Sequence, residues 1–247
     1  MAMHDFSQLE QDLSLWNIPL SEEQKEQLQQ YYLLLTERNA QMNLTAIDAF
    51  PDFCRLHVAD SLALLRFLPE QISRETGGRK VADLGSGAGF PGMILKLFSP
   101  DWEVHLVETQ GKRVLFLEEV RAAILPADEG IHIQKMRAEE AGRMPKLREH
   151  FSLVTARAVA ELSVLLEYAL PLLSVGGVFA AYKSRETDEE IEGAAKALEI
   201  LGGRLLRTED YVLPNTDTAR RLVFVEKVKA TEEKYPRRAG MAKKRPL

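Results

Sequence analysis

The stretch VADLGSGAGFPGMILKLF, Val81–Phe98, joins the pattern of a buried strand to that of a helix through a glycine-rich turn. Val81–Leu84 is apolar except for Asp83, and Met93–Phe98 is again mainly apolar. Glycines between the two segments allow positive φ angles and let a ligand approach the backbone closely. This order of strand, glycine turn and helix is typical of an α/β sheet that binds a nucleotide-like ligand.

The glycines of this turn match two different fingerprints. Gly87, Gly89 and Gly92 spell the dinucleotide pattern G-x-G-x-x-G. Gly85, Gly87 and Gly89 spell G-x-G-x-G, with Asp83 two residues upstream. A carboxylate beside a pyrophosphate would be repelled, whereas Asp83 suits the cationic amino group of S-adenosylmethionine, directly or through water. We therefore expect Asp83, Gly85, Gly87 and Gly89 to bind S-adenosylmethionine.

Strands alternate with helices over the rest of the chain, and this alternation predicts a parallel sheet covered on both faces. The expected strands are 80–84, 103–108, 131–135, 151–156, 178–183, 204–213 and 222–228. Only Pro214–Arg221 separates the last two strands, which is too short for a crossover helix, so they should form an antiparallel hairpin. The predicted fold class is α/β: a Rossmann-like, class I methyltransferase sheet of seven mostly parallel strands, with an N-terminal helical extension.

Three segments are predicted from the pattern along the chain. Residues 1–76 form the helical extension, in which Ser21 and Gln24 make a capping box. Residues 77–229 form the methyltransferase domain, with the boundary placed near Gly77 in a polar linker. Residues 230–247 form a basic tail.

Composition and charge narrow the class of protein. The 247-residue chain has no long apolar run, no signal-peptide pattern at its start and a single cysteine, so we expect a cytoplasmic protein that is not in a membrane. The net charge is -5, but Lys227–Leu247 carries +6, which leaves -11 for the rest of the chain. An acidic body with a basic tail indicates a polyanionic partner.

No acid–base constellation is evident, so no catalytic residue is assigned. The segment after the fourth strand, Ala156–Leu162, lacks the D/N-P-P-Y/F motif of exocyclic-amine methyltransferases, and Cys54 lies in the helical extension. The five histidines are scattered along the chain, so no metal is expected. Guanine N7 is a compatible acceptor, because it carries an in-plane lone pair and no proton for a base to remove.

Seven segments together resemble one family, the RsmG (GidB) family of bacterial small-subunit ribosomal RNA methyltransferases. They are NLTAI (Asn43–Ile47), HVADSLALL (His57–Leu65), DLGSGAGFPG (Asp83–Gly92), VETQGKRVLFLEEV (Val107–Val120), RAVAEL (Arg157–Leu162), YKS (Tyr182–Ser184) and YPRRAGMAKKRPL (Tyr235–Leu247). The resemblance implies methyl transfer from S-adenosylmethionine to N7 of a guanine in the 530 loop of 16S rRNA, with naked rRNA or the small ribosomal subunit as partner.

The resemblance also implies which residues hold the cofactor. The family's contacts fall on Gly85, Phe90, Glu108, Ala138, Glu139 and Arg157. Glu108 ends the second predicted strand, where a carboxylate accepts hydrogen bonds from both ribose hydroxyls. Basic residues around the same sheet edge and in the tail are our candidates for phosphate contacts in RNA binding: Lys112, Arg113, Lys183, Arg185, Arg237 and Arg238.

Two alternatives from other functional classes remain at this point. Gly87, Gly89 and Gly92 keep an NAD-dependent oxidoreductase open. The basic tail is also compatible with a non-catalytic RNA-binding factor in ribosome assembly that retains a cofactor pocket.

Overall fold

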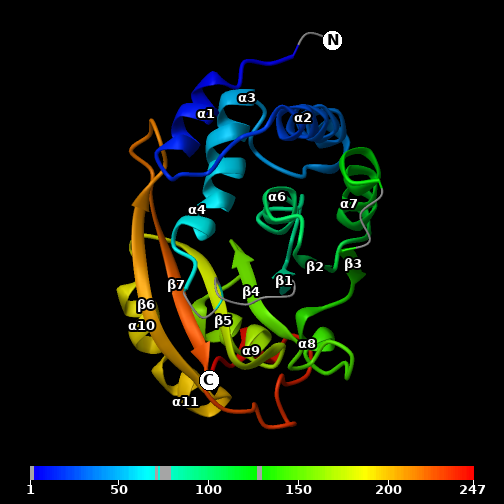
Figure 1. Ribbon diagram of the computed structural model, residues 1–247. Helices are drawn as coiled ribbons and strands as arrows, with labels where there is room; N and C mark the ends of the chain where they lie inside the picture. The colour runs from blue at the N-terminus through cyan, green and yellow to red at the C-terminus, as the bar shows by residue number, and fades with distance from the viewer. Residues whose placement is uncertain (1–2, 70–71, 73–78, 127–129) are drawn as a thin grey trace.

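A seven-stranded sheet with the order β3-β2-β1-β4-β5-β7-β6 forms the centre of the computed structural model (Figure 1), which describes residues 3–69, 72, 79–126 and 130–247. Strands β1 to β5 pair in parallel, and β7 is antiparallel to both β5 and β6. The predicted sheet and its terminal hairpin are therefore confirmed. The strands are β1 (Lys80–Leu84), β2 (Glu103–Glu108), β3 (Ile131–Lys135), β4 (Phe151–Arg157), β5 (Leu173–Ser184), β6 (Gly203–Val212) and β7 (Ala219–Lys227).

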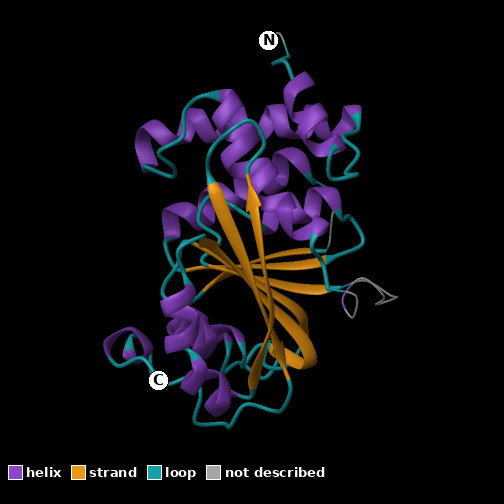
Figure 2. Cartoon of the chain, turned by 90° about the vertical axis from the view of Figure 1, so that its left-hand side faces the viewer, coloured by secondary structure: helices purple, strands orange, loops and turns teal. Residues whose placement is uncertain are grey.

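Helices cover both faces of the sheet, and Figure 2 shows them above and below the strands. One face carries the N-terminal helices together with α6 (Gly92–Phe98) and α7 (Gly111–Ile124). The other face carries α8 (Ala138–Ala141), α9 (Leu162–Ala169), α10 (Asp188–Gly193) and α11 (Ala195–Leu201). Each face buries its own apolar core, as expected for a doubly covered sheet.

The N-terminal helices share one core with the sheet. They are α1 (Ser7–Ser14), α2 (Glu22–Met42), α3 (Phe50–Asp52), the π-helix η1 (Phe53–Ala59) and α4 (Asp60–Arg66). The predicted capping box is present at the start of α2, where the side chains of Ser21 and Gln24 each accept a backbone N–H of the other. Tyr31 is fully buried and stacks on Phe90 of the glycine turn. The predicted boundary near Gly77 lies outside the described residues.

Within the predicted helical extension, Phe50–Arg66 is divided into α3, η1 and α4. The π-helical turn of η1 adds a residue to one turn of the helix, and such turns frequently occur at functional sites. Asn43, with φ of 50°, ends α2 before this segment begins. The result is that His57 and Asp60 are both buried.

The basic tail folds back onto the α8–α9 face rather than extending from the body. The Arg148 guanidinium donates to the carbonyl oxygens of Thr231 and Tyr235 at 2.7 and 2.8 Å. The short helix α12 (Met241–Lys244) follows, and its Ala242 is buried in the core of this face. In the part of the chain that the structure describes, no helix is long and apolar enough to cross a bilayer.

Candidate functional site

The glycine turn after β1 has the geometry that the sequence predicts. Gly85, Gly87 and Gly89 have φ angles of +68°, +59° and +98°, a region that other residues rarely adopt. A Cβ atom on Gly85 would lie 2.8 Å from the Val159 side chain. At Gly87 the nearest atom would be 3.8 Å away, so the backbone there has open space beside it. A Cβ on Gly89 would clash with the Tyr31 hydroxyl, so the turn is tightly packed at Gly85 and Gly89 and open to a ligand at Gly87.

Asp83 is completely buried beneath this turn. Its carboxylate accepts hydrogen bonds from the Thr155 hydroxyl at 2.8 Å and from the Gly92 N–H at 3.2 Å. Burial raises the pKa of Asp83 to about 6, although these hydrogen bonds favour the charged form. The geometry therefore makes Asp83 a support that holds the turn against β4 and the start of α6.

Glu108 ends β2 beside the turn and is also buried. One carboxylate oxygen accepts the Gly87 N–H at 2.9 Å, and the other accepts the N–H groups of Thr109 and Gln110 at 2.6 and 2.8 Å. The Arg113 guanidinium lies 3.8 Å away. The carboxylate is thus fixed at the carboxyl edge of the sheet, where the first parallel strands of this fold place their ligand.

Four of the predicted cofactor residues line one cavity of about 180 Å³: Gly85, Glu108, Ala138 and Glu139. The tail closes this cavity, because Gly240 and Lys243 line it and the Gly240 N–H donates to Glu139 at 2.8 Å. Sequence reasoning assigned the tail to RNA and missed this contact.

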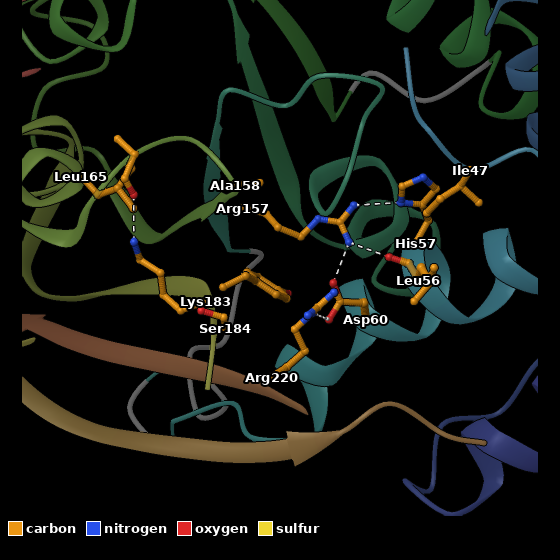
Figure 3. Close-up of a pocket in the computed structure, with 12 residues that line it drawn as sticks. Ile47, Leu56, His57, Asp60, Arg157, Ala158, Leu165, Lys183, Ser184 and Arg220 are labelled. Carbon is orange, nitrogen blue, oxygen red and sulfur yellow. Dashed lines mark hydrogen bonds and ion pairs between the residues drawn. The ribbon is translucent and has the colours of Figure 1, made fainter. Parts of the chain in front are cut away.

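A second cavity, of about 200 Å³, continues past the glycine turn and is lined by Gly85, Gly87, Phe90 and Arg157. A third, of about 450 Å³, shares His57, Arg157 and Ala158 with the second and opens between β4, β5 and the N-terminal helices (Figure 3). Three further charged residues line this third cavity: Asp60, Arg220 and Lys183, the last of which is a predicted RNA-binding residue. The three cavities lie in a row: the first and second share Gly85, and the second and third share Arg157.

Arg157 links the second and third cavities through a buried network. Its guanidinium donates to Asp60 at 2.8 Å, to the Leu56 carbonyl at 3.0 Å and to His57 Nδ1 at 3.2 Å (Figure 3). Since arginine only donates, His57 Nδ1 is the acceptor, and the proton on Nε2 is donated to the Thr45 hydroxyl at 2.9 Å. Burial and then the charge of Arg157 lower the pKa of His57 to about 3, so its ring stays neutral.

His57 and Asp60 are the site residues that sequence reasoning missed. His57 stacks on Phe90 with ring centroids 4.1 Å apart, and Asp60 also accepts a hydrogen bond from Tyr211 at 2.7 Å. Their spacing of three residues in HVADSLALL, on a predicted helix, was the available signal, because it places both side chains on one face.

The six predicted RNA-binding residues do not share one environment. Lys112 and Arg238 are exposed, and Arg185 is 65% exposed and lies 3.6 Å from Asp210. Arg113 lines the second cavity. Lys183 donates to the Ala160 carbonyl and to Glu190.

Arg237 is held by the protein itself. Its Nε atom donates to both carboxylate oxygens of Glu167, at 2.9 and 3.0 Å, and its Nη2 atom donates to one of them at 2.5 Å. The Glu167 side chain is only 1% exposed. The structure thus separates Arg237, which anchors the tail, from Arg238, which is free to face solvent.

Comparison with protein families gives one match over most of the chain. The family model described as GidB, rRNA small subunit methyltransferase G, matches residues 24–223. A ribosomal RNA small subunit methyltransferase G of Lactobacillus delbrueckii subsp. bulgaricus is 44% identical over 95% of this chain and 96% of its own length. The protein of the same name from Pelotomaculum thermopropionicum is 43% identical over 93% of each chain.

Solved structures with this fold are also methyltransferases. A variant of the 16S rRNA (adenine(1408)-N(1))-methyltransferase from Catenulisporales acidiphilia matches with a TM-score of 0.51 and 17% identity over 66% of this chain and 92% of that one. A predicted O-methyltransferase from Agrobacterium tumefaciens matches with a TM-score of 0.51 and 19% identity over 72% and 83% of the two chains. At this identity, the likeness establishes the fold of class I methyltransferases.

Proposed function

Since the chain belongs to the rRNA small subunit methyltransferase G family, we propose that it transfers a methyl group from S-adenosylmethionine to N7 of a guanine in the 530 loop of 16S rRNA. The observation that carries this proposal is the row of three connected cavities. The two smaller ones together have the size of the cofactor, and the second of them meets the larger cavity at Arg157. An NAD-dependent oxidoreductase is not supported, because the strand order and terminal hairpin are those of methyltransferases.

The residues of the first two cavities fit the proposed cofactor. The open backbone at Gly87 leaves room for the ribose and methionine parts, while Val159 fills the space beside Gly85. Glu108 offers a buried carboxylate to the ribose hydroxyls, and Ala138 and Glu139 border the place for adenine. When bound, S-adenosylmethionine supplies an electrophilic methyl group on a sulfonium.

The third cavity is the proposed place for the guanine. Its volume of about 450 Å³ lies within the range of pockets that enclose a base-sized ligand. Because N7 has a lone pair and no proton, the transfer calls for neither a general base nor a metal; alignment is enough. Asp60 lines this cavity with its carboxylate 2.8 Å from Arg157 and 3.9 Å from Arg220, so it orients the two guanidinium groups around the place proposed for the base. A ribosomal substrate also agrees with the cytoplasmic location that the sequence predicts.

The experiment that tests the function is transfer of a tritiated methyl group from labelled S-adenosylmethionine to 16S rRNA that lacks the modification. We expect label in the 530 loop, with naked rRNA, intact small subunits and assembly intermediates tried in parallel. Absence of label in all three, together with normal RNA binding, would support the non-catalytic alternative. Quenching of NADH fluorescence by the protein would support the oxidoreductase.

Glu108→Gln should weaken binding of S-adenosylmethionine by at least about tenfold, because it removes a charged acceptor worth about 1.5–3 kcal/mol. The amide oxygen can still accept the N–H groups of Thr109 and Gln110, but the NH2 group then faces the Gly87 N–H, so the melting temperature should also fall and the affinity is measured well below it. Calorimetric titration measures the affinity. The matched control is Glu118→Gln on α7, whose side chain is 49% exposed. Equal affinities of the two variants for S-adenosylmethionine would show that Glu108 does not bind the cofactor.

Arg238→Glu and Arg237→Glu should separate RNA binding from folding. Arg238 is exposed, so its reversal should lower affinity for rRNA and reduce the slope of log affinity against log salt by about 1–2, with an unchanged melting temperature. Arg237→Glu places a second carboxylate against buried Glu167, so it should destabilise the fold by about 3–5 kcal/mol. Filter binding at several salt concentrations and thermal melting measure the two effects. An unchanged salt slope for Arg238→Glu would argue against RNA contact by the tail.

A further inference from the structure

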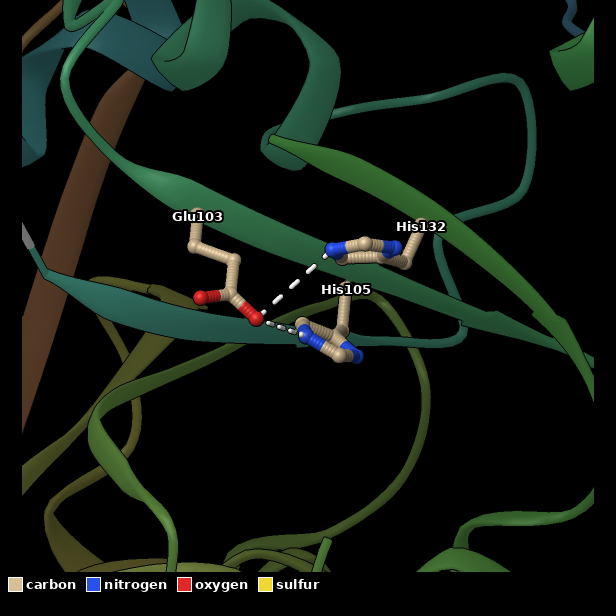
Figure 4. A group of neighbouring side chains, drawn as sticks. All are labelled: Glu103, His105 and His132. Atoms are coloured by element: carbon tan, nitrogen blue, oxygen red, sulfur yellow. Dashed lines mark hydrogen bonds and ion pairs between the residues drawn. The ribbon is translucent and has the colours of Figure 1, made fainter. Parts of the chain in front are cut away.

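Two histidines and a glutamate meet at the amino ends of β2 and β3, on the opposite edge of the sheet from the cofactor cavities (Figure 4). Glu103 and His105 are two residues apart on β2, so their side chains lie on the same face. His132 is the register partner of His105 on β3, which places it on that face as well. No local sequence pattern predicts this cluster, because 27 positions separate the two histidines along the chain.

The ligand atoms of the three side chains converge. Glu103 Oε1 lies 3.0 Å from His105 Nε2 and 3.6 Å from His132 Nε2. Each of the three side chains has a ligand atom within 4.8 Å of a ligand atom of the other two. Around a tetrahedral zinc ion with bonds of about 2.0–2.2 Å, ligand atoms are separated by about 3.3 Å. The distances from Glu103 Oε1 to the two Nε2 atoms, 3.0 and 3.6 Å, lie on either side of that value, so small side-chain adjustments suffice to admit an ion.

The packing around His105 fixes the orientation of its ring. Its Nδ1 atom is buried with no hydrogen-bond partner among the described residues, while Nε2 faces Glu103. The ring is held by an edge contact with Phe151 at 5.0 Å between centroids. Its Nε2 atom is therefore the nitrogen presented to the cluster.

The other groups around the cluster leave room for an ion. Lys80 Nζ lies 3.4 Å from Glu103 Oε2, which leaves Oε1 for the histidines, and Lys96, which lines the neighbouring hollow, donates to the carbonyl oxygens of Pro100 and Trp102. Glu103 and His132 have side chains that are 36% and 40% exposed, and both line a surface hollow with Asp101 and Trp102. An ion can therefore enter from solvent and keep a water molecule as its fourth ligand.

We propose that Glu103, His105 and His132 bind one divalent transition-metal ion of the zinc class, through Glu103 Oε1 and the two Nε2 atoms. Three protein ligands with nitrogen and oxygen donors suit Zn²⁺ better than the oxygen-rich sites of Mg²⁺ or Ca²⁺. The ion joins β2 to β3, which is the edge strand of the sheet. Glu103 and Glu108 are the two ends of β2, about 17 Å apart, so this site is separate from the cofactor cavities.

Zinc titration of the full chain, stripped of metal with EDTA, tests the proposal by calorimetry and thermal melting. We expect one Zn²⁺ per chain and a rise in melting temperature on binding. His132→Gln should lower the affinity by at least about 100-fold, since even the loss of an outer partner of a ligand costs about 10- to 100-fold. His150→Gln, at an exposed histidine elsewhere, is the matched control and should bind like the wild type.

Glu103→Gln is the second variant, and it should weaken zinc binding like His132→Gln. X-ray absorption at the zinc edge should report two imidazole ligands in the wild type. The proposal is overturned if the wild-type chain binds no zinc, or if His132→Gln and His150→Gln bind it equally. Methyl transfer by the EDTA-treated protein should persist, so this result is independent of the proposed function.

Discussion

Replacing Gly92 with alanine should lower the free energy of unfolding by about 3 kcal/mol, at the upper end of overpacking effects. The added Cβ would lie 2.4 Å from the Leu106 side chain, 2.8 Å from Asp83 Cβ and 2.9 Å from its carboxylate. Leu106 and Asp83 are both fully buried, so neither can move aside without disturbing β1 or β2. Urea unfolding followed by circular dichroism measures the loss.

The matched control is Gly193→Ala at the end of α10, where an added Cβ meets nothing within 4 Å. That variant should be neutral or slightly stabilising, by up to about 1 kcal/mol. Equal stability of the two alanine variants would contradict the packing account. The comparison also explains why the dinucleotide pattern appears in this chain: Gly92 is the first residue of α6, and its missing side chain lets the helix lie against β1 and β2.

The sheet could be predicted from the sequence because its signals are local. Each strand is a short apolar run bounded by turn residues, and the short Pro214–Arg221 connection forces a hairpin. The glycine turn and Glu108 follow their strands directly, so the parallel topology alone brings them to one edge.

The rest of the site depends on contacts between distant segments, which no local pattern specifies. Asp60 reaches Arg157 from 97 positions away, and Gly240 reaches Glu139 from 101 positions away. The tail has the composition of a solvated arm, yet Glu167 binds Arg237 and draws the tail onto the body. Prediction from charge alone therefore assigned Arg237 to RNA.

Arg157→Gln should reduce methyl transfer by at least about 100-fold. The variant removes the donor to His57 and leaves buried Asp60 with only Arg220, 3.9 Å away, as a cation, which costs about 3 kcal/mol of stability. Loss of the orientation of groups around the acceptor accounts for a rate effect of this size. Single-turnover transfer to 16S rRNA, under conditions where the variant is folded, measures the rate constant separately from the affinity for S-adenosylmethionine.

The double variant Asp60→Asn with Arg157→Gln separates stability from activity, because it removes both buried charges together. Its stability should recover most of what Arg157→Gln loses, whereas methyl transfer should stay low, since neither the guanidinium nor the carboxylate is restored.

NMR titration of His57 gives an independent measurement. The charge of Arg157 is the second cause of the low pKa of His57, so that pKa should rise from about 3 in both variants while burial keeps it below 6.5. Recovery of activity in the double variant would instead mean that the only role of Arg157 is to neutralise Asp60. An unchanged pKa of His57 would mean that the imidazole ring and the guanidinium do not interact in solution.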